Sequence, residues 1–242
     1  MKWAILSDVH GNLEALRAVL RDLQAENPQR IAFLGDAVGY GADPNECLAI
    51  LRDLTDWCVA GNHDYGAVGL TDIEAFNPAA RSAILWTRQR LSAEHQAYLR
   101  RQVLLRRDGD LAFAHATPNQ PEEWYYLLTF PEAEEAFQSF NEGLAFVGHS
   151  HRPMVLAKEG TREVEACPPE EVVLKPGARY IINVGSVGQP RDGHAEAAYG
   201  IYDDARRRYV LKRVPYDVQA AREKILRAGL PAFLAHRLSR GI

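Results

Sequence analysis

The feature that most constrains this chain occurs five times: a short apolar run is followed within two residues by glycine, aspartate or histidine. Apolar runs of this length predict buried strands, because a helix needs a longer periodic segment. In open α/β sheets, ligands bind at the carboxyl ends of the strands, so polar residues at these ends can converge on one small volume. The predicted strands span residues 3–6, 31–34, 57–60, 110–114 and 144–147.

The segments between the first three predicted strands have the periodicity of amphipathic helices. Leu13, Leu16 and Leu20 recur at helical spacing, and Asn12 can cap the helix that carries them. A second helix is predicted to begin at Asp43, which can act as its cap and is followed by a proline. Alternating strands and helices imply right-handed crossovers and a sheet that starts parallel. Helical structure is predicted over residues 72–101, with caps suggested at Asn77 and Ser92. Further helices are predicted over 131–141 and over 217–240, the last with a break at 229–231.

The second half of the chain has a different pattern, in which short strands are separated by turns. Gly109 favours a hairpin between residues 103–106 and 110–114. Neither an internal repeat nor a linker is apparent. We therefore predict a single α/β domain over residues 1–242, with two packed sheets flanked by helices. The later strands are predicted at 154–158, 163–166, 172–175, 180–184, 198–202 and 209–213.

Composition and charge restrict the function without identifying it. Hydrophobic residues make up 47% of the chain, enough for a sizeable core, so extended disorder is not expected. The net charge of −4 argues against binding of long nucleic acids, which a basic excess would favour. The three cysteines lack CxxC spacing, so neither a disulfide framework nor a zinc ribbon is expected. Without a membrane span or a signal peptide in the sequence, we expect a cytoplasmic protein.

The polar residues at the predicted strand ends suit a metal centre. Asp8 and His10 are two residues apart, as are His149 and His151, so each pair points the same way if the strand conformation continues. Imidazole together with carboxylate suits Mn, Fe and Zn. A structural zinc uses four ligands, so a larger set fits two metals that share a bridging carboxylate better than one metal. The candidate ligands are Asp8, His10, Asp36, Asn62, His115, His149 and His151.

In their order along the chain, these motifs resemble the signature of the calcineurin-like metallophosphoesterases. The stretches 35–44 and 183–190 are also similar to the small bacterial branch of that family, which has a single catalytic domain. The resemblance implies a four-layer α/β/β/α sandwich of two packed mixed sheets flanked by helices. The motifs are Asp8-x-His10, Gly35-Asp36, Gly61-Asn62-His63-Asp64, His115 and Gly148-His149-x-His151.

The resemblance also implies a role for each residue. His63 would be a catalytic residue that faces the substrate, and Asp64 would orient its ring. The cofactors would be two divalent ions, with Mn²⁺ the first choice and Fe, Zn, Ni or Mg the alternatives. The ligand sets would be Asp8, His10 and His151 for one metal, Asn62, His115 and His149 for the other, and Asp36 as the bridge.

The implied activity is hydrolysis of phosphodiester or phosphomonoester bonds by a hydroxide that bridges the two metals. His63 would neutralise charge on the phosphoryl group or protonate the leaving oxygen. Candidate substrate-binding residues are Arg191, Tyr40 and Trp124, the last of which precedes two tyrosines. Ser186 is expected to support the metal site or a turn, because the chain has no GxSxG nucleophile elbow.

An alternative to an enzyme is a scaffold or binding protein that keeps the fold without catalysis. Every candidate ligand is present together with His63, which favours the enzyme. The expected substrate is small and phosphorylated, with nucleotides among the candidates. The preferred ester class and the oligomeric state stay open at this point.

Overall fold

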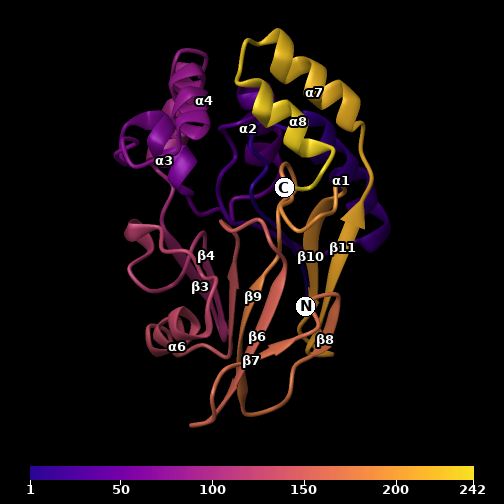
Figure 1. Cartoon of the computed structure of the whole chain (residues 1–242). Helices are drawn as coiled ribbons and strands as arrows, with labels where there is room; N and C mark the ends of the chain where they lie inside the picture. The colour runs from indigo at the N-terminus through magenta and orange to yellow at the C-terminus, as the bar shows by residue number, and fades with distance from the viewer.

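The computed structural model describes all 242 residues and contains two β-sheets packed face to face, with helices on their outer faces (Figure 1). Both sheets are mixed, since each combines parallel and antiparallel neighbours. The expected α/β/β/α sandwich is therefore confirmed.

The first sheet contains the amino-terminal strand and the last strands of the chain. Its strand order is β2-β1-β10-β11-β8. Strands β1 and β2 are parallel, as the first crossover predicts, and the other pairs are antiparallel. Its strands are β1 (Lys2–Leu6), β2 (Arg30–Phe33), β8 (Glu171–Val173), β10 (Ala197–Asp203) and β11 (Arg208–Val214).

The second sheet is built from the middle of the chain. Its strand order is β3-β4-β5-β9-β6-β7, and the predicted hairpin forms its β3-β4 edge. Strands β4, β5 and β9 are parallel to one another, so their carboxyl ends meet at the same edge of the sheet. Its strands are β3 (Leu105–Asp108), β4 (Leu111–Ala114), β5 (Leu144–Val147), β6 (Met154–Glu159), β7 (Glu165–Cys167) and β9 (Ala178–Asn183).

The core between the sheets follows from the two-residue period of the strands. Trp3 and Ile5 of β1 point toward the second sheet, whereas Ala4 and Leu6 pack with the helices. Phe146 of β5 lies in the same inter-sheet layer as Trp3. A continuous apolar run such as β1 therefore has both faces buried, as expected for a strand inside a layered sandwich.

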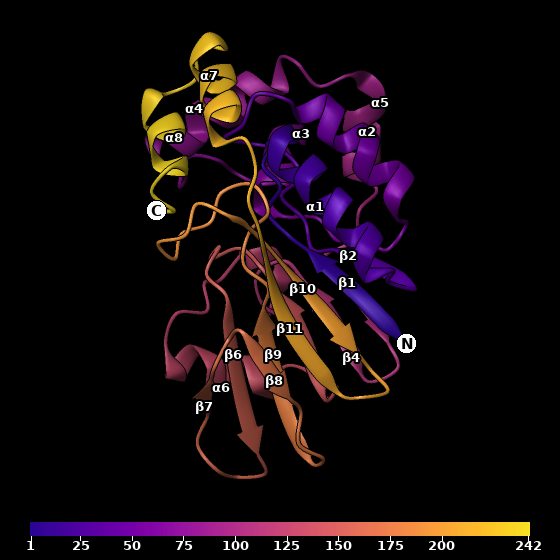
Figure 2. The same cartoon turned by 90° about the vertical axis from the view of Figure 1, so that its right-hand side faces the viewer.

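Helices cover the outer face of each sheet. Helix α1 (Leu13–Glu26) packs on β10 and β11, and α6 (Phe130–Gln138) covers the second sheet. Figure 2 shows the other helices gathered at one end of the molecule, away from α6. They are α2 (Pro44–Leu54), α3 (Asn62–Val68), α4 (Pro78–Arg88), α5 (Ala93–Arg100), α7 (Val218–Arg227) and α8 (Ala232–Leu238), and a 3₁₀ turn (Pro121–Glu123) precedes α6.

Two sequence predictions differ from the structure. The strand predicted at 57–60 forms only isolated parallel bridges, from Cys58 to Phe33 and from Val59 to Val103. The helical region predicted at 72–101 begins only at Pro78, and within it Asn77 and Ser92 cap α4 and α5 with their side chains, as the sequence suggests. None of the helices combines the length and the apolar character that crossing a membrane needs.

Candidate metal centre

The strand ends bring the candidate ligands together at one edge of the two sheets. Strand β1 leads into Asp8 and His10, and β5 leads into His149 and His151. None of the seven candidate ligands, which we call the metal centre, is more than 7% exposed. Donor atoms lie within 4.8 Å of one another in three groups, which are Asp8–His10–His151, Asp36–His115–His149 and His10–Asp36–His63.

The backbone at the metal centre is left-handed rather than extended. This corrects the expectation that the strand conformation continues through Asp8 and His10. Left-handed backbone costs a non-glycine residue about 1–2 kcal/mol, so such residues persist only where surrounding structure holds them. Here the N–H groups of Asp8 and His10 donate to the carbonyls of Gly35 (3.0 Å) and Asp36 (2.9 Å). The left-handed ligands, with φ between 50° and 65°, are Asp8, His10, Asp36, His149 and His151.

Three imidazoles are oriented by the same kind of hydrogen bond. In each, Nδ1 lies within hydrogen-bond distance of a backbone carbonyl oxygen. A carbonyl can only accept, so Nδ1 carries the hydrogen and Nε2 of the neutral ring is a bare lone pair. The carbonyls belong to Val38 for His10 (3.0 Å), Leu34 for His115 (2.8 Å) and Gln189 for His151 (2.6 Å).

The ring nitrogens then face one another across the metal centre. Nε2 of His10 lies 3.0 Å from Nε2 of His151, and Nε2 of His115 lies 3.2 Å from Nδ1 of His149. Lone pairs this close repel unless a proton or a metal ion lies between them. The residues therefore fit divalent ions with nitrogen and oxygen ligands. Other buried atoms that could ligate a metal and have no hydrogen-bond partner are Asp8 Oδ1, Asn62 Oδ1 and His149 Nε2.

Two ionised carboxylates complete this arrangement. Asp36 Oδ2 lies 3.3 Å from His115 Nε2 and 3.5 Å from His10 Nε2, so Asp36 reaches both imidazole pairs. Asp8 Oδ1 lies 3.2 Å from His151 Nε2. Burial alone would raise both carboxyl pKa values, but a proton on the facing imidazole, His151 for Asp8 and His115 for Asp36, holds them well below their usual range.

The imidazole pair on the His115 side differs in charge between its two rings. Burial lowers the pKa of an imidazole, but the Asp36 carboxylate outweighs it and raises the pKa of His115 to about 9. Burial, together with the His115 charge, lowers the pKa of His149 to about 3. The pair thus holds one proton in a place where a metal ion would compete with it.

Asp64 does not orient His63, which corrects the role that the resemblance implies. Its carboxylate accepts from the backbone N–H groups of Asp36 (2.8 Å), Gly61 (3.2 Å) and Val38 (3.3 Å). His63 and Asp64 are successive residues of α3, so their side chains diverge by about 100° around the helix. Asp64 therefore ties together the loops that carry the metal centre.

His63 keeps a free ring nitrogen beside the metal centre. The backbone N–H of His63 donates to Asp36 Oδ1 (2.8 Å), while the ring Nδ1 is buried without a partner. Burial lowers the pKa of His63 to about 4, so the ring is neutral. Gly39 leaves the space that Nδ1 occupies, because a Cβ at that position would lie 2.4 Å from it. The ring also packs 4.5 Å from the Tyr40 ring, measured between centroids.

The loop after β9 holds the backbone at Asp8, directly after β1, by hydrogen bonds. Ser186 Oγ and the Gly188 N–H both donate to the Asp8 carbonyl at 2.9 Å. Ser186 therefore supports the metal centre, as expected. Sequence reasoning missed Asn183, whose Nδ2 donates to the Gly148 carbonyl (2.5 Å) and so fixes the loop that carries His149. Its signal was the polar stretch that directly follows an apolar strand.

Tyr40 and Arg191 both lie on the His10–His151 side of the metal centre. The Tyr40 ring is 4.6 Å from the His10 ring, and the Arg191 guanidinium carbon lies 5.6 Å from the Tyr40 ring centre. Arg191 is held in place because its N–H donates to the His151 carbonyl (3.2 Å) and its Nη2 donates to Gln189 Oε1 (2.9 Å). A guanidinium held in this way can bind an anionic group on the His10–His151 side of the metal centre.

Aromatic residues lie on the opposite side, beside His115 and His149. Trp124 contacts His115 edge-on with ring centroids 6.0 Å apart, and its Nε1 donates to Thr71 Oγ1 (3.2 Å). Tyr126 stacks on His149 at 4.1 Å and is 46% exposed. Tyr126 is thus the more accessible of the two, a distinction that the sequence alone does not make.

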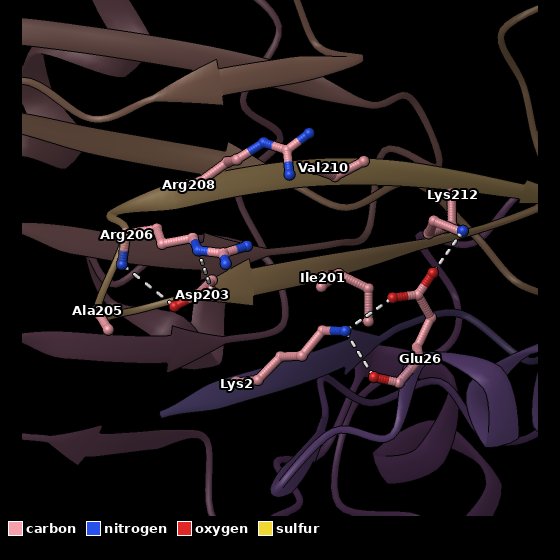
Figure 3. A pocket seen from close by; sticks show the side chains of 9 residues that line it. All are labelled: Lys2, Glu26, Ile201, Asp203, Ala205, Arg206, Arg208, Val210 and Lys212. Atoms are coloured by element: carbon pink, nitrogen blue, oxygen red, sulfur yellow. Dashed lines mark hydrogen bonds and ion pairs between the residues drawn. The ribbon is translucent and has the colours of Figure 1, made fainter.

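A separate pocket of about 420 Å³ lies at the other end of β1 (Figure 3). Lys2 and Lys212 both donate to Glu26, at 2.9 and 2.6 Å, and Arg206 pairs with Asp203 at 3.7 Å. Its lining carries four cationic side chains and two carboxylates, and none of its lining residues belongs to the metal centre.

Comparisons with known proteins agree with this fold. Residues 1–205 match the sequence profile of the Calcineurin-like phosphoesterase superfamily domain. An uncharacterized protein of Methanocaldococcus jannaschii is 42% identical over 243 aligned positions, which cover 98% of this chain and 97% of that protein. The crystal structure of a metallophosphoesterase from Sphaerobacter thermophilus is 39% identical, with a TM-score of 0.87 and coverage of 100% of this chain and 99% of that one. A hypothetical protein from Pyrococcus horikoshii OT3 shares the fold at 18% identity, with a TM-score of 0.78 and coverage of 100% and 98%.

Asp36→Asn is expected to remove metal from both halves of the metal centre. The change replaces a charged oxygen that reaches both imidazole pairs by a neutral amide. Metal content, measured by elemental analysis after reconstitution and desalting, should fall toward zero rather than by half. The control is Asp22→Asn, at a carboxylate that accepts from the Tyr199 hydroxyl (2.6 Å) and lies outside the metal centre. Normal metal content in Asp36→Asn would show that Asp36 does not bridge.

Gly148→Ala is expected to displace Asp8. A Cβ at Gly148 would lie 2.0 Å from Ser7 Oγ and 2.6 Å from Asp8 Oδ2, so the carboxylate must move. Both metal content and melting temperature should fall. Gly160→Ala is the control, because φ there is +58° and its Cβ would meet no atom within 4 Å. It should cost about 1 kcal/mol of stability and leave metal content unchanged. Equal metal content in the two variants would contradict the assignment of Asp8.

Proposed function

Since this chain belongs to the calcineurin-like phosphoesterase superfamily, we propose that it is a metal-dependent hydrolase that cleaves phosphodiester or phosphomonoester bonds. The observation that carries the proposal is the pair of imidazole contacts, at 3.0 and 3.2 Å, between two ionised carboxylates in a buried cluster. Divalent ions bound there would supply Lewis acidity that activates a water and neutralises charge on phosphorus-bound oxygens.

The proposed ligands divide between two ions. Imidazole and carboxylate donors suit Mn²⁺, which we propose as the native ion, ahead of Fe, Zn, Ni or Mg. Asp36 would serve both ions, because it is the carboxylate that belongs to two of the three donor groups. The remaining ligands would be Asp8, His10 and His151 for one ion and Asn62, His115 and His149 for the other.

His63 is proposed to contact the substrate. Its Nδ1 is buried beside Gly39, and a ring nitrogen lies within 4.8 Å of a carboxylate oxygen of Asp36, so Nε2 is the nitrogen that would reach the substrate. From there it can donate a hydrogen bond to a phosphoryl oxygen or to the leaving oxygen. Asp64 would act only through the backbone that it holds. His63 is also in one of the three donor groups, so the metal content of a His63 variant must be measured together with its rate.

Tyr40 and Arg191 are proposed to bind the phosphoryl group on the His10 side. Arg191 offers a guanidinium that Gln189 orients, and Tyr40 is buried between that guanidinium and His10. We propose a small phosphorylated substrate rather than a long nucleic acid, because the chain carries a net charge of −4.

Metal removal tests the proposed function directly. The protein reconstituted with Mn²⁺ should hydrolyse bis(p-nitrophenyl) phosphate, p-nitrophenyl phosphate, or both. Protein treated with a chelator and then desalted should lose this activity and regain it when Mn²⁺ returns. Undiminished turnover by the metal-free protein would refute a metal-dependent mechanism, and no turnover of either ester by the loaded protein would refute the hydrolase.

His63→Ala should separate chemistry from metal binding. Metal content should stay close to wild type, while the rate falls by about 10²–10⁴-fold for esters with alkoxide leaving groups. Aryl esters, whose leaving group needs no proton, should lose less. The matched control is His95→Ala, which removes a buried imidazole that contacts Asn45 on α2. Lost metal would make His63 a ligand, and an unchanged rate for every ester would exclude it from catalysis.

A further inference from the structure

A pocket of about 440 Å³ opens beside the aromatic side of the metal centre. Two of its lining residues are close to ligands of the metal centre, one in sequence and one in space. Thr117 follows His115 by two residues, and Tyr126 stacks on His149 with its ring inclined by 26°. A group that occupied this pocket would therefore lie next to a phosphorus held at the metal centre. The pocket is lined by Thr117, Asn119, Tyr125, Tyr126, Leu128, Glu132, Glu135 and Ala136.

The pocket offers flat and apolar surface to a ligand. Tyr125 is 48% exposed and Leu128 is 57% exposed, so both leave large apolar surfaces in water when the pocket is empty of ligand. Exposed aromatic and aliphatic side chains grouped around a hollow mark a binding site more often than a random surface. Tyrosine faces stack on planar rings, and every nucleobase has such a face.

This pocket differs in charge from the His10–His151 side of the metal centre. Its lining includes Glu132 and Glu135 and contains no lysine or arginine. Glu132 stays ionised because the N–H groups of Leu128 (2.7 Å) and Thr129 (2.8 Å) donate to its carboxylate and lower its pKa. A second anionic group is therefore disfavoured here, whereas Arg191 stands on the other side.

Polar atoms in the pocket are free to recognise an amino group. The Asn119 side chain and the Glu135 carboxylate make no hydrogen bond within the protein, although both line the hollow. Two oxygen acceptors beside an aromatic wall suit a flat ring that bears an exocyclic amine, since the amine needs acceptors and the ring needs stacking. Adenine has this combination.

The segment that forms the aromatic wall is held in an uncommon conformation. Gln120 (φ 43°) and Trp124 (φ 57°) are left-handed and flank the 3₁₀ turn at Pro121–Glu123. Trp124 is anchored inward by Thr71 and packs against Tyr65, which leaves the next two tyrosines at the pocket. Strained backbone of this kind concentrates at binding sites.

We propose that this pocket binds the nucleobase of a nucleotide phosphoester, with an amino-bearing base such as adenine stacked on Tyr126 and Tyr125. The inference rests on the proposed function for the position of the phosphorus, and it names the class of substrate. The base lies on the His149 side, and the charged part of the substrate lies toward Arg191.

Adenosine tests the pocket without any turnover, because it carries the base and the sugar but no phosphate. Saturation-transfer NMR and a titration with the protein as purified should show binding, while ribose alone should show none. Tyr125→Ala and Leu128→Ala should each weaken adenosine binding by about tenfold, the loss typical for one stacking or apolar contact. Phe233→Ala and Leu226→Ala, which remove exposed side chains of α8 and α7, are the matched controls and should bind adenosine as wild type does.

Each outcome decides the inference. Binding that weakens in the two pocket variants and not in the controls supports it. No adenosine binding, or binding that both pocket variants retain, overturns it, provided that their melting temperatures show folded protein. Turnover of aryl phosphate esters without adenosine binding would refute the pocket alone, whereas adenosine binding without turnover of any ester would refute the hydrolase alone.

Discussion

The rest of the structure depends on the burial of imidazoles and carboxylates that the protein leaves short of partners. Removing a polar group from water without a hydrogen bond costs roughly 1–3 kcal/mol in proteins, and an unpaired charge costs more. Here Nε2 of His10 and Nε2 of His151 face each other at 3.0 Å, where a proton or a cation must relieve their repulsion, and Asp8 keeps an oxygen without any hydrogen bond. Such a cluster is unfavourable for the apoprotein and favourable around cations, so metal affinity and folding stability are linked at this site.

The fold meets this cost by making the surroundings rigid. Strands β1 and β5 lie in different sheets, yet both end at the metal centre, because the apolar layer between the sheets holds the two sheets together. Beyond the strands, hydrogen bonds from Ser186 and to Asp64 fix the left-handed turns that aim the ligands. Neither residue needs to touch a metal to determine where the ligands lie. The strain at Asp8 and its neighbours is thus held by the parts of the fold that are hardest to deform.

The sequence predicts this site well where residue type alone is informative. Short apolar runs followed by Asp or His predict both the strands and the convergence of their ends. That convergence needs the parallel β1–β2 and β4–β5 pairs and also the packing of the two sheets that contain them. It fails where the outcome depends on backbone direction. Asp8 and His10 share a centre through left-handed turns, not through strand alternation. The role of Asp64 was also missed, because a carboxylate beside a histidine in sequence looks like its partner until the helical turn separates them.

The part of the chain beyond the family match packs against the His10 side of the metal centre. The match ends at residue 205, and all the candidate ligands precede that point. Helix α8 packs Leu234 and Leu238 in the same apolar cluster as Tyr40, which contacts the His10 ring. Burial and the charge of Arg191 lower the pKa of Arg237 of α8 to about 10. The ligands alone would set which metal binds and how phosphorus is activated. Under the proposed function, selection among phosphoesters would fall instead to the walls, with Arg191 on the His10 side and Tyr126 on the other.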